Sequence, residues 1–97
     1  MNMKEKQQEL AAAMADKLPQ IRKEYGFSQT QFGALVGKSR QQLSAIERKT
    51  TPLPWDTLLA IIMLAQKNDK EKLSRIMGKE WIVEVNLCLS IIAMTKM

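Results

Sequence analysis

Three neighbouring residues at 40–42 carry side chains that suit the reading of nucleic-acid bases. Arg40 has a guanidinium group, and Gln41 and Gln42 have amides. A guanidinium donates two parallel hydrogen bonds to guanine O6 and N7, and a glutamine amide bonds adenine N6 and N7. We therefore expect base contacts from Arg40 and Gln41. Ser44 and Ala45 follow as further candidates, because a hydroxyl and a methyl group there can face the same groove.

Two short helices must position these side chains. Ser28 and Ser39 are good N-caps for helices over 29–36 and 40–48, and Gly37 suits the end of the first one. Serine-capped helices joined by a glycine-bearing turn within twenty residues have the spacing of a compact helix-turn-helix. The inner faces are expected to hold Phe32, Leu35, Val36, Leu43 and Ile46.

The positive charge is concentrated around this pair of helices. The chain has 15 basic and 10 acidic residues among 97, for a formal net charge of +5. Residues 18–51 hold six of the basic residues and only Glu24 and Glu47 as acids, whereas residues 1–17 are balanced. A basic bias confined to one motif favours a polyanion as the partner, with ordinary surface charge as the alternative.

Several function classes are excluded or disfavoured by composition. The chain has no His and a single Cys, Cys88, so one chain cannot form an internal disulfide, a Cys/His zinc site or a Ser–His or Cys–His catalytic pair. We expect no enzyme activity, cofactor or metal. The polar start is unlike a secretory signal, and no apolar run reaches the roughly 20 residues that span a bilayer. A cytoplasmic location is the default expectation.

The flanking elements are also predicted to be helical. Residues 4–17 favour helix, and Pro19 suggests that a new helix begins near Leu18 and ends at Tyr25, which makes 1–17 a separate or kinked arm. A buried helix is expected over 55–66 after the proline-containing loop 49–54, with Leu58, Ile61, Ile62 and Ala65 inward. A fifth helix, capped by Asn68 or Asp69, is expected to end at Gly78.

The last segment, 79–97, is the most ambiguous. From Trp81 to Ile91 every odd position is apolar, and this alternation favours a strand. A helix is the alternative, because Ile82, Val85, Leu89 and Ile92 also fall at helical spacing. An exposed apolar strand would pair with a second subunit, so we expect this segment to act in dimerisation, with packing on the chain's own helices as the alternative.

The pattern over residues 21–60 resembles the Cro/repressor-type helix-turn-helix family, also named the XRE family. The matching residues stand together at fixed spacing: Ile21-Arg22, Gly26, Ser28-Gln29, Phe32-Gly33, Gly37, Ser39-Arg40, Leu43-Ser44, Ile46-Glu47 and Pro54. The resemblance implies an all-α, five-helix, lambda-repressor-like DNA-binding domain over 18–78, whose third helix enters the major groove. It also implies a two-fold dimer.

The resemblance further implies roles for single residues. Gln29 would reach a DNA phosphate and brace the recognition helix, and Glu47 would pair with Arg22. Lys49 stands where many members have glycine, and Lys38 where many have a small apolar residue. The remaining phosphate contacts are expected from Lys38, Ser39, Gln42, Lys49, Thr50 and Thr51, which would set register and carry little sequence information.

Two functions are compatible with these features. The first is a sequence-specific transcriptional regulator, a small bacterial or phage repressor that binds a two-fold operator as a homodimer. The second is an antitoxin-type protein that engages a partner such as a toxin and regulates its own promoter. A membrane-surface role is disfavoured, because few basic residues flank the apolar segment.

Overall fold

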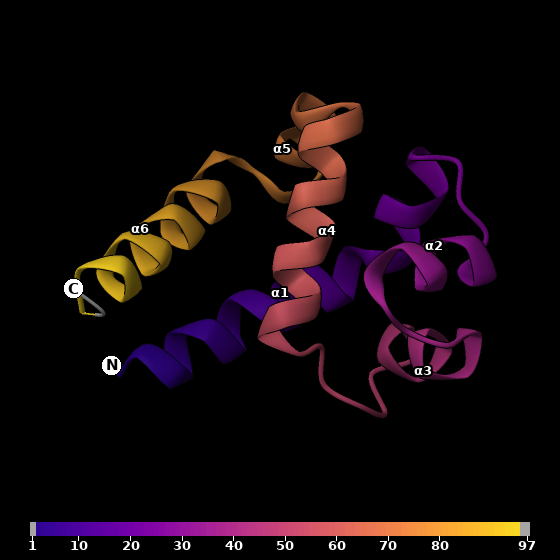
Figure 1. Cartoon of the computed structure of the whole chain (residues 1–97), viewed down its shortest axis with the longest axis horizontal. Coiled ribbons are helices and arrows are strands. Elements are labelled where there is room, and N and C mark those ends of the chain that lie inside the picture. Colours follow the sequence, from indigo (N-terminus) through magenta and orange to yellow (C-terminus); the bar gives the residue numbers. More distant parts are fainter. Residues whose placement is uncertain (1, 96–97) are drawn as a thin grey trace.

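The chain is built from helices alone over the part that the computed structural model describes, residues 2–95, with side chains through residue 91. Six helices follow one another in this range (Figure 1). Their bounds are α1 Met3–Glu24, α2 Gln29–Val36, α3 Arg40–Glu47, α4 Trp55–Asn68, α5 Lys70–Met77 and α6 Lys79–Thr95. The expected all-α class is confirmed. None of these helices combines the length and hydrophobicity needed to cross a membrane.

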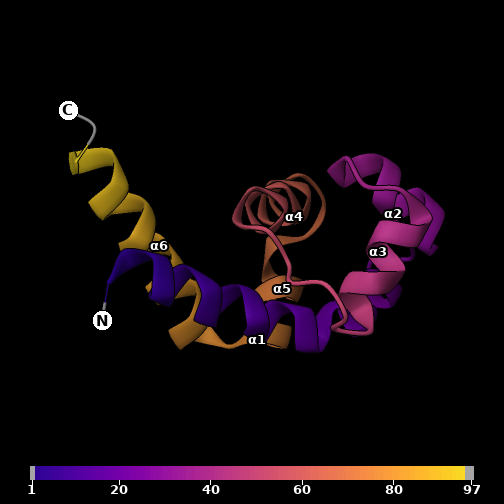
Figure 2. The same cartoon turned by 90° about the horizontal axis from the view of Figure 1, so that it is seen from below.

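The α2–α3 pair and the single helix α6 occupy opposite ends of the molecule's long axis. α2 and α3 lie at one end, and α6 lies at the other together with both termini (Figures 1 and 2). α1 runs between the two ends and packs against α3, α4, α5 and α6. Because α1 contacts both ends, it holds the α2–α3 pair and α6 in one structure.

The expected break at Pro19 does not occur, so the prediction of a separate helix from Leu18 is wrong. Proline removes one backbone hydrogen bond from a helix interior, yet α1 continues through it to Glu24. Leu10, Met14, Leu18 and Ile21 are all buried on one face of this helix. Tertiary burial on both sides of Pro19 outweighs the local preference for a break.

One hydrophobic core joins the six helices. It includes Leu18, Phe32, Leu43 and Leu58, each almost completely buried. The expected inner residues of α4 are buried, except that Ile62 is only partly so. The prediction that Leu35 faces inward is wrong, because this residue is 53% exposed.

A tyrosine fastens the end of α1 to the start of α5. The Tyr25 hydroxyl accepts a hydrogen bond from the Leu73 backbone N–H at 3.1 Å and donates one to the Asp69 carbonyl. Asp69 also caps α5, since its carboxylate accepts from the Lys72 N–H at 3.3 Å, and Gly78 ends the helix as expected.

The predicted strand over 81–91 is wrong, because this segment lies within α6. Trp81, Val85 and Cys88 are buried at helical spacing, and the Trp81 indole N–H donates to the Leu10 carbonyl at 3.0 Å. A strand here would find no partner strand within residues 2–95, whereas a helix satisfies its backbone groups internally. The segment 79–97 extends past the described residues, and the Ile92 side chain lies outside them.

Candidate nucleic-acid interface

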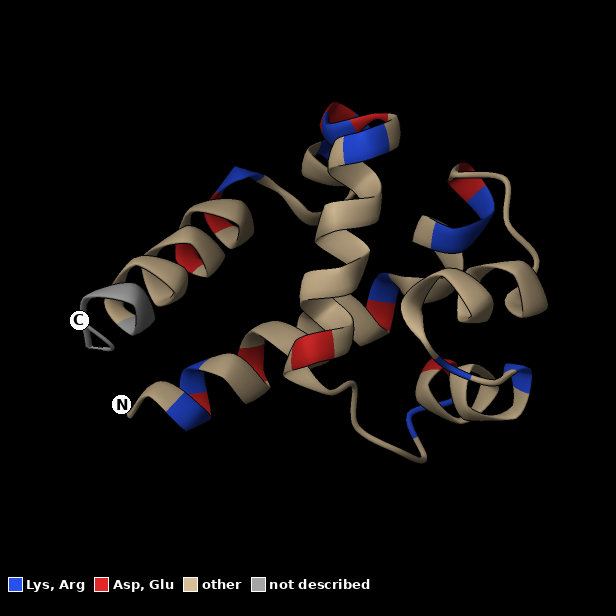
Figure 3. Cartoon of the chain, viewed as in Figure 1, with Lys and Arg blue, Asp and Glu red and all other residues tan. Residues whose placement is uncertain are grey.

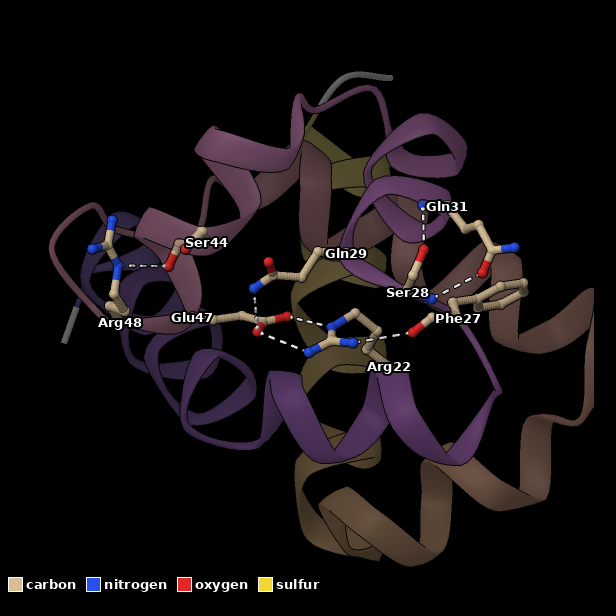
Figure 4. A network of polar contacts seen from close by, with 8 residues as sticks. All are labelled: Arg22, Phe27, Ser28, Gln29, Gln31, Ser44, Glu47 and Arg48. Carbon is tan, nitrogen blue, oxygen red and sulfur yellow. Dashed lines mark hydrogen bonds and ion pairs between the residues drawn. The ribbon is translucent and has the colours of Figure 1, made fainter.

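The starts of α2 and α3 are fixed by two matching capping boxes. The Ser28 hydroxyl accepts from the Gln31 N–H at 3.1 Å, and the Gln31 amide oxygen accepts from the Ser28 N–H at 2.9 Å (Figure 4). Ser39 and Gln42 repeat this arrangement at 3.0 and 2.9 Å. Each box satisfies backbone donors that a helix start otherwise leaves open. The serine caps predicted from the sequence are confirmed.

The turn between α2 and α3 depends on two glycines. Gly37 adopts a left-handed φ of 76°, which ends α2. At Gly33, a Cβ would lie 2.5 Å from the Lys38 carbonyl oxygen. The backbone of the turn therefore approaches α2 closely enough to exclude any side chain at residue 33, and this contact sets the angle of α3.

A buried polar network ties α3 to α1 and α2. The Arg22 guanidinium donates to both carboxylate oxygens of Glu47, at 2.8 and 3.2 Å, and to the Phe27 carbonyl at 3.1 Å (Figure 4). The Gln29 amide donates to Glu47 at 3.1 Å. Only 12% of the Arg22 side chain and 7% of the Glu47 side chain are exposed. The expected Arg22–Glu47 pair is confirmed, and it fixes the end of α3.

The end of α3 is closed by a Schellman motif. The Lys49 N–H donates to the Ile46 carbonyl and the Thr50 N–H to the Ala45 carbonyl, both at 3.0 Å. Lys49 takes the left-handed position with φ 63°, and it is the one non-glycine residue with positive φ within residues 2–95. The Thr50 hydroxyl adds a bond to the Ala45 carbonyl at 3.1 Å.

The four predicted base-contacting residues lie along α3, but they differ in accessibility. Arg40 and Gln41 are exposed, and no other residue of the described part bonds to their side chains. Ser44 and Ala45, one turn later, are half-buried. The exposed first turn of α3 therefore presents an unengaged guanidinium and an unengaged amide to solvent.

A hollow of about 290 Å³ runs beside this face of α3. It is bounded by the helix on one side and by the loop that follows it on the other. Two predicted base contacts line it, Gln41 and Ala45, and so do three predicted phosphate contacts, Lys38, Gln42 and Thr51.

Several predicted phosphate contacts already have partners inside the protein. Gln29 is bonded to Glu47, and Ser39 and Gln42 form the capping box. The Thr50 hydroxyl hydrogen is directed to Ala45, and Lys49 forms an ion pair with Asp16. Thr51 is exposed and Lys38 is half-buried. Their role as phosphate contacts stays a prediction.

Two residues of this surface were not among the predicted contacts. The Arg48 Nε donates to the Ser44 carbonyl at 3.3 Å, at the exposed end of α3 (Figure 4). Asp16 comes from α1 and meets Lys49. Arg48 is adjacent to the predicted contacts in sequence, whereas only the packing of α1 beside α3 reveals Asp16.

Basic residues stand at both ends of α3. Figure 3 shows basic segments of ribbon at both ends of α3, where Arg40 begins the helix and Arg48 caps it. A sequence model of the helix-turn-helix family matches residues 20–64, from the last turn of α1 into α4. The chain carries a helix-turn-helix domain. The domain is of the Cro/repressor type, the XRE family, and it supports DNA-binding transcription regulation as the function. Neither a curated protein nor a solved structure is significantly similar to the chain.

Proposed function

We propose that the helix-turn-helix regulator is a repressor in the cytoplasm that binds a two-fold symmetric operator as a homodimer. The main support is the first turn of α3, where the side chains of Arg40 and Gln41 are exposed and make no bond within the protein. The capping box of Ser39 and Gln42 fixes the start of this helix. In this proposal Arg40 reads guanine and Gln41 reads adenine, with Ser44 and Ala45 against neighbouring bases.

The phosphate contacts would come from both sides of the recognition helix. Lys38 and Ser39 stand before α3, and Lys49, Thr50 and Thr51 stand after it. Ser39 Oγ accepts in the cap but keeps its own hydroxyl hydrogen, which a phosphate oxygen can receive. Gln42 and Gln29 likewise retain amide hydrogens beyond their bonds within the protein.

The apolar outer face of α6 supports the dimer. Val83, Leu87 and Ile91 follow one another at intervals of one helical turn and are 55%, 57% and 50% exposed, whereas Leu89 lies on another side of α6 and lines a hollow with Ile62 and Ala65. Exposed apolar side chains grouped on one helix are typical of an interaction surface. α6 lies at the end of the molecule away from α3 (Figures 1 and 2), so pairing through α6 leaves both recognition helices open to DNA.

Selection of bound sequences from random DNA by the purified protein tests this proposal. We expect enrichment of a two-fold symmetric consensus, because a two-fold dimer presents two equivalent recognition helices. An asymmetric consensus would contradict the symmetric dimer, and failure to enrich any sequence would contradict sequence-specific binding.

A further inference from the structure

An acidic residue lies against the basic surface of the helix-turn-helix domain. Asp16, on α1, forms an ion pair with the ammonium group of Lys49 just after α3. Both side chains are accessible, with 56% of Asp16 and 61% of Lys49 exposed. A carboxylate on this surface needs an explanation, because it repels DNA phosphates.

The other acidic residue of the α3 region does not raise this question. Glu47 is buried, and both its oxygens receive bonds from Arg22 and Gln29. Within residues 2–91, Asp16 is therefore the exposed carboxylate that forms an ion pair with a basic residue flanking α3.

Stability alone does not account for the Asp16–Lys49 pair. An exposed ion pair contributes little to stability, because water screens both charges. Lys49 occupies the left-handed φ of 63°, where a residue with a side chain is disfavoured relative to glycine. The chain therefore keeps a lysine at a strained position, and the pair does no more than offset that cost.

The Schellman motif makes this lysine a fixed point of the surface. Its backbone is held by the bonds of residues 49 and 50 to α3, so the side chain starts from a defined place at the end of the recognition helix. Lys49 can reach either Asp16 or a phosphate beside that helix end.

We propose that Asp16 is an affinity-limiting residue, which holds Lys49 in the free protein and releases it when Lys49 binds a backbone phosphate of DNA. This inference rests on the proposed DNA contact of Lys49. Lys49 must give up the Asp16 carboxylate before it binds a phosphate. Its contact with DNA is therefore weaker than the contact of a lysine that has no partner in the free protein. Because phosphates are the same in every sequence, Asp16 limits binding to all duplexes alike.

The test is the substitution Asp16→Asn, which removes the charge and keeps the shape of the side chain. Binding of the variant and of the wild-type protein to a short mixed-sequence duplex is measured over a range of salt concentrations. We expect the variant to bind about threefold more tightly at low salt, as one removed like charge near a phosphate predicts. The plot of log binding constant against log salt concentration should also be steeper for the variant, by up to about one unit of slope.

Two further variants separate this mechanism from a general charge effect. Glu71→Gln makes the same charge change in the first turn of α5, outside the α2–α3 motif, and should leave binding unchanged. In a Lys49→Gln background, the gain from Asp16→Asn should shrink, because no lysine is left to release. Circular dichroism confirms that each variant is folded.

The possible results are distinguishable. If the wild-type protein binds the duplex and Asp16→Asn binds it with equal or lower affinity, the inference is overturned and the proposed function stays intact. An equal gain in the Lys49→Gln background also overturns it, since Asp16 would then act by repulsion alone. A wild-type protein that binds no duplex overturns the proposed function and the inference together.

Discussion

At the scale of single residues, Arg40 and Gln41 differ from Ser39, Gln42 and Gln29 because the polar ends of their side chains are not used inside the protein. Ser39, Gln42 and Gln29 each bond a neighbouring residue. Side chains that are both exposed and unengaged lose no internal bond when they turn to a base edge. Sequence discrimination is therefore expected to depend on Arg40 and Gln41 more than on residues that shape the motif.

The substitution Arg40→Ala should cost about 1–3 kcal/mol of binding to the selected operator and relax the preference at one base pair, because a bidentate contact to guanine is lost. Titration of the operator and of single-base variants measures both effects. Arg75→Ala, at an exposed position on α5, is the control with the same charge change and should bind as the wild type does. Unchanged binding by Arg40→Ala would refute its base contact.

The substitution Glu47→Ala should destabilise the fold by about 3 kcal/mol, the lower part of the range for breaking a buried ion pair. It leaves the guanidinium of Arg22 with only the Phe27 carbonyl as a partner and frees the Gln29 amide. Urea unfolding measures the loss, and Glu80→Ala, at an exposed position on α6, should show almost none. Full stability of Glu47→Ala would show that the network does not hold α1 against α3.

Contacts of single residues can be predicted from the sequence where a family pattern supplies them, but not where they join residues far apart in the chain. The Arg22–Glu47 pair was predicted because the family resemblance supplied it, and the structure confirms it. The pairing of Asp16 with Lys49 was not, because it joins α1 to the residue after α3 and no local rule relates them. The exposure of Leu35 was also missed, since apolar character alone does not say which side of a short helix is covered.

At the scale of elements, the helices with clear start and stop signals were predicted well. Ser28, Ser39 and Asp69 cap α2, α3 and α5 in the structure, and α2 has the predicted bounds. Elements whose outcome depended on tertiary packing were predicted wrongly. α1 passes Pro19 because its buried face continues, and 81–91 is helical because no strand lies beside it within the described chain.

The end of α3 offers a prediction in which stability and binding change in opposite directions. Lys49→Gly should stabilise the protein by about 0.5–1 kcal/mol, because glycine adopts the left-handed φ of the Schellman motif without strain. The same variant loses the proposed phosphate contact, so it should bind all DNA more weakly and with a shallower salt dependence. Thermal unfolding and salt-dependent titration measure the two effects, and a destabilised variant would contradict the strain at Lys49.

The junction of α1 and α5 gives a prediction that includes pH. Tyr25→Phe removes the hydroxyl that bridges Leu73 and Asp69, and should cost about 1–2 kcal/mol for the two bonds. Burial raises the pKa of the Tyr25 phenol above its ordinary value of 10.0. The neutral phenol therefore stabilises the fold below pH 10, and this contribution is lost as the pH rises through the folded-state pKa.

Urea unfolding of wild type and Tyr25→Phe at neutral pH and above pH 10 checks this contribution. The difference in unfolding free energy should narrow at the higher pH, while lysine titration affects both proteins alike. A difference that stays constant or widens with pH would contradict the assigned role of the hydroxyl.

At the scale of the whole molecule, α1 separates two surfaces with different chemistry. The α2–α3 end is basic (Figure 3) and carries the candidate base contacts, whereas α6, at the other end (Figure 1), exposes Val83, Leu87 and Ile91 at successive turns. Removal of α6 is a poor test of its outer face, because Trp81, Val85 and Cys88 belong to the core. A substitution on the exposed side separates dimerisation from folding.

Leu87→Lys is that substitution. In a dimer through α6, it places a charge without a partner in an apolar contact, which should weaken association by about 3 kcal/mol, or about 100-fold. Leu87 is 57% exposed in the single chain, so the unfolding free energy of the monomer should change little. Sedimentation at several concentrations should show a dimer for the wild type and a monomer for the variant. Operator affinity should fall with the loss of the dimer, because one recognition helix then binds without its partner.

Met63→Lys, at a similarly exposed apolar position on α4, is the matched control and should remain dimeric. If Leu87→Lys stays dimeric while Met63→Lys dissociates, the two subunits meet through α4 and the apolar face of α6 needs another explanation.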